Sequence, residues 1–199
     1  GVFLHESSHY LMAKLLRAPT GRFSLIPSVL PDGTMRLGYV ETAEADFIRD
    51  ALIGMAPLIA GGAATAAISL GALRIQPALA ALTLGQIAAA ADWLRALPAQ
   101  ADFWLWFYLL FTVSSTMLPS SSDRKKWLPM FLLILSLTAL VAVFGAGNWM
   151  LNTAAPWLNG VLQSVAVVFA VSLLVHLALL LPFYLLRRLL NRVTGLRVG

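Results

Sequence analysis

Residues 161–186 read VLQSVAVVFAVSLLVHLALLLPFYLL, an apolar run in which only His176 can carry a charge near neutral pH. Residues 127–143, WLPMFLLILSLTALVAV, form a second run of this kind. Because about 20 predominantly apolar residues let a helix cross a bilayer, both runs predict membrane-spanning helices. The whole chain agrees, since 59% of its 199 residues are hydrophobic, 12% are charged and its mean hydropathy is +0.81. Typical soluble domains carry roughly twice that charged fraction, which excludes a soluble protein.

The charged residues and the absence of cysteine limit which partners the protein can bind and which kinds of metal or redox site it can contain. The chain has 14 Lys and Arg against 9 Asp and Glu. These cations flank apolar segments and do not form a stripe interleaved with aromatic residues, which indicates a basic membrane face and no nucleic-acid partner. The chain has no cysteine, so disulfides, thiol nucleophiles and thiolate metal sites are excluded. Any metal must therefore be held by nitrogen and oxygen ligands.

We expect an all-α, multi-pass membrane protein, a bundle of about five transmembrane helices with a small β-hairpin after the first helix. The expected helices cover residues 1–17, 47–70, 103–118, 127–147 and 160–186. The first is short for a span, so we expect the chain to be a fragment that begins within a helix. Residues 148–159 are expected to form a loop.

The expected hairpin lies in a polar insert after the first helix. Residues 22–28 and 34–41 have strand-like composition, and Pro31, Asp32 and Gly33 between them are typical of a turn. The sequence therefore predicts a hairpin at the membrane surface.

Residues 75–102 allow two topologies, because they fit either a span or a helix on the outer surface. If they lie on the outer surface, twelve of the 14 Lys and Arg face the cytoplasm, all but Arg74 and Arg95. If they span, the cations at 124–126 move to the side opposite the first loop, against the positive-inside rule. We therefore predict five spans and a cytoplasmic C-terminus, and the compact chain favours a prokaryotic cell membrane.

The first helix carries His5-Glu6-Ser7-Ser8-His9, an HExxH pattern. Residues four apart share one face of a helix, so both imidazoles can reach one Zn²⁺, while Glu6 can reach a metal-bound water as a general base. Ionisable groups in an apolar helix are costly unless they are paired, wet or metal-bound, which also indicates function. The alternative is an interfacial helix whose polar face is merely solvated.

A tetrahedral catalytic zinc needs a third protein ligand, which must be His176 or one of the other carboxylates. Asp123 is the preferred candidate, because it follows a span that runs toward the same side as the end of the first helix. It could instead pair with the cations at 124–126 or cap the next helix. Asp32 is more typical of a turn. His176, deep in the last helix, is more typical of a packing or hydrogen-bonding residue.

Residues 5–16, HESSHYLMAKLL, resemble the HExxH helix of the site-2 protease class of intramembrane zinc metalloproteases. Residues 22–25 and 38–41 resemble the hairpin of that family, and residues 56–61, APLIAG, resemble its next core helix. Residues 115–123, STMLPSSSD, stand where the family has NxxPxxxxDG. Here Thr116 replaces the Asn, the Pro-to-Asp spacing is one residue shorter, and Arg124 replaces the Gly.

The resemblance implies a metalloprotease-like membrane core over residues 1–126, followed by two further transmembrane helices and a basic tail over 127–199. It implies Zn²⁺ on His5, His9 and Asp123, inside the membrane near the cytoplasm, and an endopeptidase that cleaves transmembrane protein substrates. Zinc would polarise the scissile carbonyl, and Glu6 would move the proton of the attacking water to the leaving amine. A strand of the hairpin could hold the substrate extended.

Two other functions stay open on the sequence alone. The altered region around Asp123 suits a catalytically inactive scaffold or binding protein of the same fold, although the intact Glu6 argues against it. An ion- or proton-coupled transporter would also place His and Glu within the membrane, but the sequence contains no internal repeat. The serines lie in no GxSxG context, so a serine protease has little support.

Overall fold

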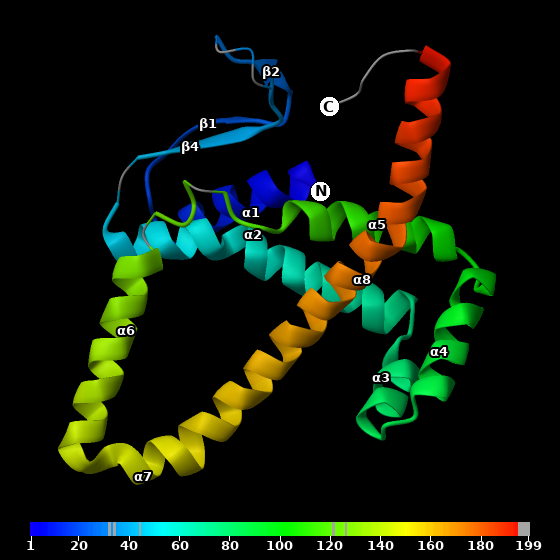
Figure 1. The fold of residues 1–199 in the computed structure, drawn as a ribbon. Helices are drawn as coiled ribbons and strands as arrows, with labels where there is room; N and C mark the ends of the chain where they lie inside the picture. The colour runs from blue at the N-terminus through cyan, green and yellow to red at the C-terminus, as the bar shows by residue number, and fades with distance from the viewer. Residues whose placement is uncertain (32, 34, 44, 121, 126, 195–199) are drawn as a thin grey trace.

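The structure, a computed structural model, describes residues 1–31, 33, 35–43, 45–120, 122–125 and 127–194. The chain is mostly helical, with small two-stranded sheets near its N-terminus (Figure 1). Its α-helices are α1 (Val2–Leu15), α2 (Phe47–Ala67), α3 (Gln76–Thr83), α4 (Ile87–Ala96), α5 (Phe103–Thr116), α6 (Trp127–Val141), α7 (Gly147–Trp149) and α8 (Ala155–Thr194). Shorter helical turns cover Ile68–Ala72, Leu97–Ala99, Ala142–Ala146 and Met150–Ala154. The prediction of a mostly helical chain with a small β insert is confirmed.

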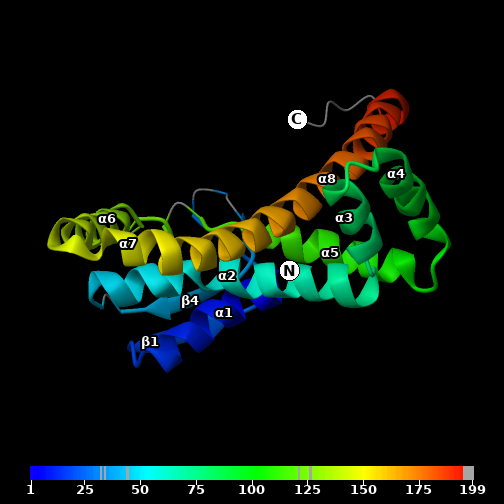
Figure 2. The same cartoon turned by 90° about the horizontal axis from the view of Figure 1, so that it is seen from below.

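Helices α1, α2 and α5 run side by side, with α2 in the middle (Figure 2). The chain enters α2 through Asp46, whose side chain accepts hydrogen bonds from the backbone N–H groups of Ile48 and Arg49 at 3.1 and 3.0 Å. Near the other end of α2, a Cβ atom on Gly61 would lie 2.3 Å from Cβ of Met117, just past α5. The glycine therefore lets α2 and the end of α5 approach closely.

The insert after α1 is a two-part hairpin. Strand β1 (Thr20–Ser24) pairs with β4 (Tyr39–Thr42), and β2 (Ser28–Val29) pairs with β3 (Met35–Arg36), both antiparallel. Gly33 at the tip has a φ of 81°, a left-handed conformation that glycine adopts easily. The predicted hairpin is confirmed, although Asp32 and residue 34 lie outside the described residues.

Residues 75–102 form two short helices in place of one long one. Gly85, with a φ of 71°, separates α3 from α4. These helices have 8 and 10 residues, lengths of roughly 12 and 15 Å at 1.5 Å per residue. Neither can cross a hydrocarbon core of about 30 Å, so the alternative of a single span is wrong.

The chain from Trp127 onward forms a V (Figure 1). Helices α6 and α8, which contain the two apolar runs, are its arms, and α7 lies at its point. The chain reverses after α6, where Gly145 has a φ of 87°. The loop expected over residues 148–159 is wrong. Gly147 begins α7 and does not interrupt it, and Pro156 falls in the first turn of α8, where proline is tolerated.

Helix α8 has 40 residues, which is about 60 Å of helix. It bends in its C-terminal half (Figure 1), and Pro182 lies inside it. Proline removes one helical hydrogen bond and clashes with the preceding turn, which accounts for the bend.

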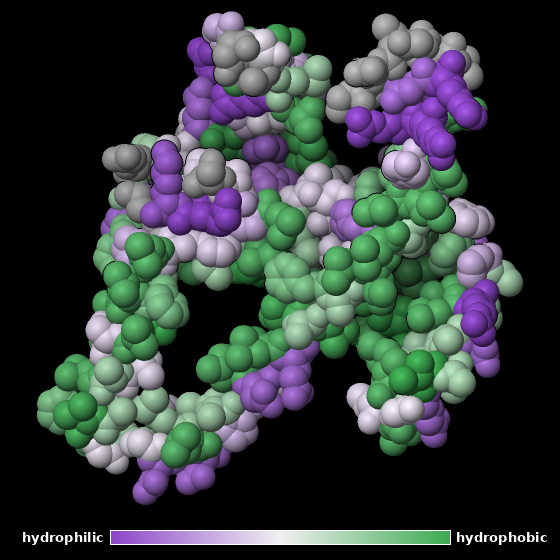
Figure 3. Space-filling view, in the orientation of Figure 1, coloured by the Kyte–Doolittle hydropathy of each residue, from purple (hydrophilic) through white to green (hydrophobic). Residues whose placement is uncertain are grey.

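Apolar side chains cover much of the surface, including both arms of the V (Figure 3). Two stretches are long and apolar enough to cross a membrane, Phe47–Ala72 and Trp127–Arg192, the second containing both arms. Helix α5 is apolar but shorter. The expected bundle is formed by α1, α2 and α5 with part of α8. Helix α6 touches the bundle at α2, but none of its described residues is buried.

Candidate metal centre

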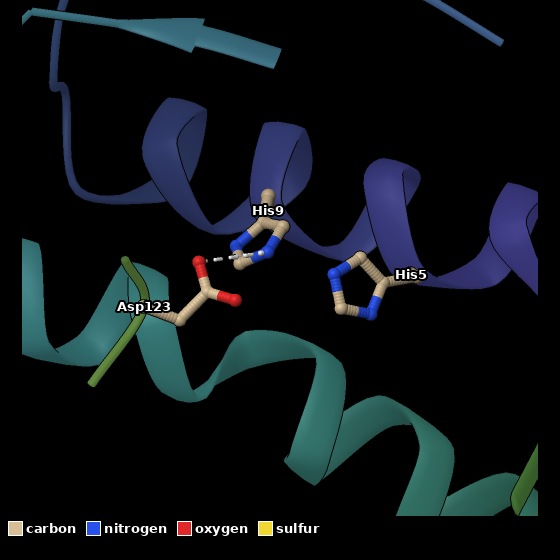
Figure 4. A group of neighbouring side chains, drawn as sticks. All are labelled: His5, His9 and Asp123. Carbon is tan, nitrogen blue, oxygen red and sulfur yellow. Dashed lines mark ion pairs between the residues drawn. The ribbon is translucent and has the colours of Figure 1, made fainter. Parts of the chain in front are cut away.

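His5 and His9 lie one turn apart on α1 and point toward α2 and the segment that follows α5 (Figure 4). Their ring centroids are 4.9 Å apart, with the rings nearly perpendicular. His9 is buried, at 8% exposed, and His5 is half-buried. The spacing of the two residues on the helix thus brings both imidazoles to the same place.

Each imidazole is oriented by a backbone carbonyl. Nδ1 of His5 lies 2.6 Å from the carbonyl oxygen of Thr116, at the end of α5, and Nδ1 of His9 lies 2.8 Å from that of Ile53, in α2. Because a carbonyl oxygen only accepts, Nδ1 of each ring must carry a hydrogen, and in the neutral ring Nε2 is left with a lone pair. Metal-binding histidines are commonly held in this way.

Asp123 completes the group from the loop between α5 and α6 (Figure 4). Its Oδ1 lies 3.5 Å from Nε2 of His9, and one ligand atom from each of His5, His9 and Asp123 lies within 4.8 Å of the others. Ligands on a tetrahedral zinc, at bond lengths of about 2.0–2.2 Å, are about 3.3–3.6 Å apart. The described residues therefore fit a metal ion after a small inward movement. The predicted proximity of Asp123 to the two histidines is confirmed.

The other oxygen of Asp123 is held by the loop itself. Oδ2 accepts hydrogen bonds from the backbone N–H of Ser120 at 2.8 Å and from its hydroxyl at 2.6 Å. Asp123 forms no ion pair with Arg124 or Lys125 among the described residues, and Lys126 lies outside them. One oxygen of the Asp123 carboxylate is thus held by hydrogen bonds within its own loop, as in a helix cap. The other oxygen faces Nε2 of His9.

Gly54 lets the Asp123 loop lie directly on α2. A Cβ atom at this position would be 2.2 Å from the carbonyl oxygen of Asp123 and 3.2 Å from its Cα. Gly54 follows Ile53, whose carbonyl orients His9, so the backbone of α2 supports two members of the group over two consecutive residues. Any other side chain at position 54 would push the loop away from the histidines.

We therefore expect Gly54→Ala to weaken the binding of a metal ion such as Zn²⁺ by about tenfold or more, because the displaced loop carries Asp123. The matched control is Gly62→Ala in the same helix, where the nearest atom to an added Cβ is Cγ1 of Val168 at 3.9 Å. Zinc affinity, measured by competition with a chelator, should fall only in the first variant. Equal affinities for both variants would contradict the role assigned to Gly54.

Glu6 follows His5 on α1 and lies under the hairpin. A Cβ atom on Gly38, next to β4, would be 2.9 Å from Cγ of Glu6. The carboxylate of Glu6 has no hydrogen bond or ion pair to any described residue. Glu6 is therefore the residue next to His5 on α1, and its carboxylate has no hydrogen-bonding or ionic partner among the described residues.

His176 is outside the group. It lies on α8, with Nε2 3.0 Å from the hydroxyl of Ser115 and Nδ1 2.7 Å from the carbonyl oxygen of Ser172. The expectation that it is a hydrogen-bonding residue is confirmed. Sequence reasoning missed the carbonyls of Ile53 and Thr116, because a backbone carbonyl leaves no signal in the sequence.

No family model, curated protein or solved structure matches this chain. The His5, His9 and Asp123 group, with the chemistry of its neighbours, is therefore the feature of this chain that points to a function.

Proposed function

We propose that this chain is an intramembrane zinc metalloendopeptidase that cleaves transmembrane protein substrates near the cytoplasmic side of the membrane. The observation that carries the proposal is the convergence of His5, His9 and Asp123 to within 4.8 Å, from positions more than a hundred residues apart in the chain. Two histidines and one carboxylate form a ligand set used by catalytic zinc. A purely structural site has no need of a carboxylate such as Glu6, which follows the ligand candidate His5 and has no partner among the described residues.

The residues divide the chemistry between them. Zinc, when bound, supplies a Lewis acid for the scissile carbonyl and increases the acidity of water. His5, His9 and Asp123 would hold the ion, the histidines through the ring nitrogens that their backbone hydrogen bonds leave available. Glu6 takes the proton of the attacking water and later delivers it to the leaving amine, since its carboxylate is not engaged elsewhere among the described residues.

A lipid environment is supported by the exposed apolar helices. The window of highest hydropathy in Trp127–Arg192 averages 2.6, and only 6% of it is buried inside the protein. Soluble proteins rarely expose apolar patches larger than a few hundred Å². We therefore propose that the V of α6 and α8 lies in the bilayer, in a multi-pass protein in which α1 and α5, with 14 residues each, are shorter than a full span.

The cytoplasmic location of the site is supported by the cations next to it. Lys14 and Arg17 lie at the end of α1, less than three turns beyond His9, and Arg124 directly follows Asp123. Arg187, Arg188 and Arg192 follow the apolar part of α8. The positive-inside rule assigns all of these to the cytoplasmic side.

The hairpin suggests how an unfolded substrate segment is held. Among the described residues β1 and β4 pair only with each other, so each has one unpaired edge. The chain just before β4 contacts Glu6 through Gly38. A substrate strand added to this small sheet would lie extended close to Glu6, the conformation in which peptide bonds are accessible.

The proposal is tested with the purified full chain in liposomes and a set of transmembrane peptides. We expect cleavage by the zinc-loaded protein, loss of cleavage after chelation and recovery on addition of zinc, with products identified by mass spectrometry. Zinc binding without cleavage of any peptide would favour the inactive scaffold. Absence of both would overturn the proposal.

The topology has a separate test that exploits the lack of cysteine. Arg95→Cys and Arg188→Cys each introduce a single thiol at an exposed position. We expect a membrane-impermeant maleimide to label Arg95→Cys in intact cells and Arg188→Cys only after permeabilisation, because the two positions lie on opposite sides. Labelling of Arg188→Cys in intact cells would contradict the orientation.

A further inference from the structure

The third histidine of the chain links α8 to the end of α5. Nε2 of His176 lies 3.0 Å from Oγ of Ser115 in α5. Ser115 is exposed and His176 is half-buried, and the ring of Phe111 is centred 5.3 Å from that of His176. Val175, at 6% exposed, belongs to the buried cluster that α8 shares with α5. His176 therefore lies where α8 packs on the core.

The hydrogen-bond partners of His176 and Ser115 determine where their hydrogen atoms lie. Nδ1 of His176 lies 2.7 Å from the carbonyl oxygen of Ser172 and must donate to it, so in the neutral ring Nε2 is an acceptor. Ser115 has one hydroxyl hydrogen, which it can direct to Nε2 or to the carbonyl oxygen of Phe111 at 2.7 Å. When it is directed to Nε2, a hydrogen bond on the surface of the protein joins the two helices.

The next residue after Ser115 is part of the metal centre. The carbonyl oxygen of Thr116 accepts from Nδ1 of His5, the bond that aims Nε2 of His5 at the other ligands. On the α2 side, Met117 is 2% exposed and packs against Gly61. The end of α5 is thus held from two sides, by α2 at Met117 and by α8 at Ser115.

We propose that His176 and Ser115 are positioning residues of the metal centre, which hold the carbonyl of Thr116 where it orients His5. This inference rests on the proposed zinc site. It makes α8 a support of the site although α8 contributes no ligand, and it assigns a role to the one histidine outside the HExxH pattern.

The same pair does not form a second catalytic site. Ser115 lies inside α5, so the backbone N–H groups around it belong to the helix and none is available as an oxyanion donor. Its hydroxyl also bonds to its own helix at Phe111. These contacts fit a link between helices and lack what a nucleophile needs.

The test compares Ser115→Ala, His176→Ala and the double variant with the wild-type chain in detergent. We expect each single variant to bind zinc about fivefold to tenfold more weakly, somewhat below the 10- to 100-fold typical of direct outer partners of a metal ligand. The double variant should be no weaker than either single one, because both remove the same bond. Ser115→Thr, which keeps the hydroxyl, should restore wild-type affinity.

Ser164→Ala is the matched control, since Ser164 is also on α8 and bonds only within its own helix, to the carbonyl oxygen of Gly160 at 2.9 Å. Its zinc affinity should equal that of the wild type, and circular dichroism should show the same helix content in all variants. If the wild type binds zinc and the single variants bind it equally well, the inference is overturned while the proposed function stands. Additive losses in the double variant would also overturn it. A wild-type chain that binds no zinc would overturn both.

Discussion

Replacing Glu6 with glutamine is expected to lower the rate of peptide cleavage by about 10²- to 10⁴-fold, the range contributed by a positioned acid or base. The glutamine side chain keeps the size and polarity of Glu6 but cannot take a proton from water. Because Glu6 is not one of the three ligand residues, zinc content should stay at the wild-type level. The measurement is the turnover rate on a transmembrane peptide at saturating zinc, with the metal quantified in the same sample.

Asp92→Asn serves as the control for this substitution. Asp92 is an exposed carboxylate on α4 that pairs with Arg95 at 2.8 Å. The same change from carboxylate to amide there should leave both turnover and zinc content unchanged. Cleavage by Glu6→Gln at the wild-type rate would rule out the protease mechanism.

Removing Asp123 is expected to have the second large effect. Asp123→Ala deletes the only carboxylate of the metal-binding group and should weaken zinc binding by more than about 100-fold, because the loss of even an outer partner costs 10- to 100-fold. Cleavage should be lost with the metal. Zinc affinity is measured by competition with chelators of graded strength.

Ser120→Ala separates the ligand role of Asp123 from its role in the loop. This change removes the hydroxyl bond to Oδ2 but leaves the bond from the backbone N–H of Ser120. We expect a smaller loss of zinc affinity, of about tenfold. If Asp123→Ala keeps full zinc occupancy and activity, Asp123 is not the third ligand and the assignment must pass to another residue.

The helices and the hairpin could be predicted because their signals are local. The apolar runs at 127–143 and 161–186 are helical, and the turn residues around Gly33 do join two strands. The loop expected at 148–159 failed because local composition does not decide whether a chain leaves the helical conformation. The chain leaves the helical conformation at Gly145 and Ala146, before this segment, and returns to it at Gly147. The loose position of α6 was not predictable, since it depends on contacts between distant segments.

In the candidate site, too, residues with a local sequence signal could be predicted and the others could not. His5, Glu6 and His9 could be recognised because their spacing on one helix is itself the geometry. Asp123 could be proposed only by elimination and topology, since it is separated from His9 by more than a hundred residues. Gly54 carried no distinctive signal in a helix rich in Gly and Ala, although the close approach of the Asp123 loop depends on it.

The central claim is that His5, His9 and Asp123 hold one zinc ion. Zinc X-ray absorption spectroscopy on the purified, zinc-loaded wild-type chain tests it most directly, combined with the zinc content per chain. We predict about one zinc per chain, bound by nitrogen and oxygen at about 2.0–2.2 Å. The spectrum should show the outer-shell scattering of two imidazoles. This scattering should be lost in the double variant His5→Ala, His9→Ala. A chain that retains no zinc, or one whose zinc spectrum is the same in the double variant, would contradict the claim.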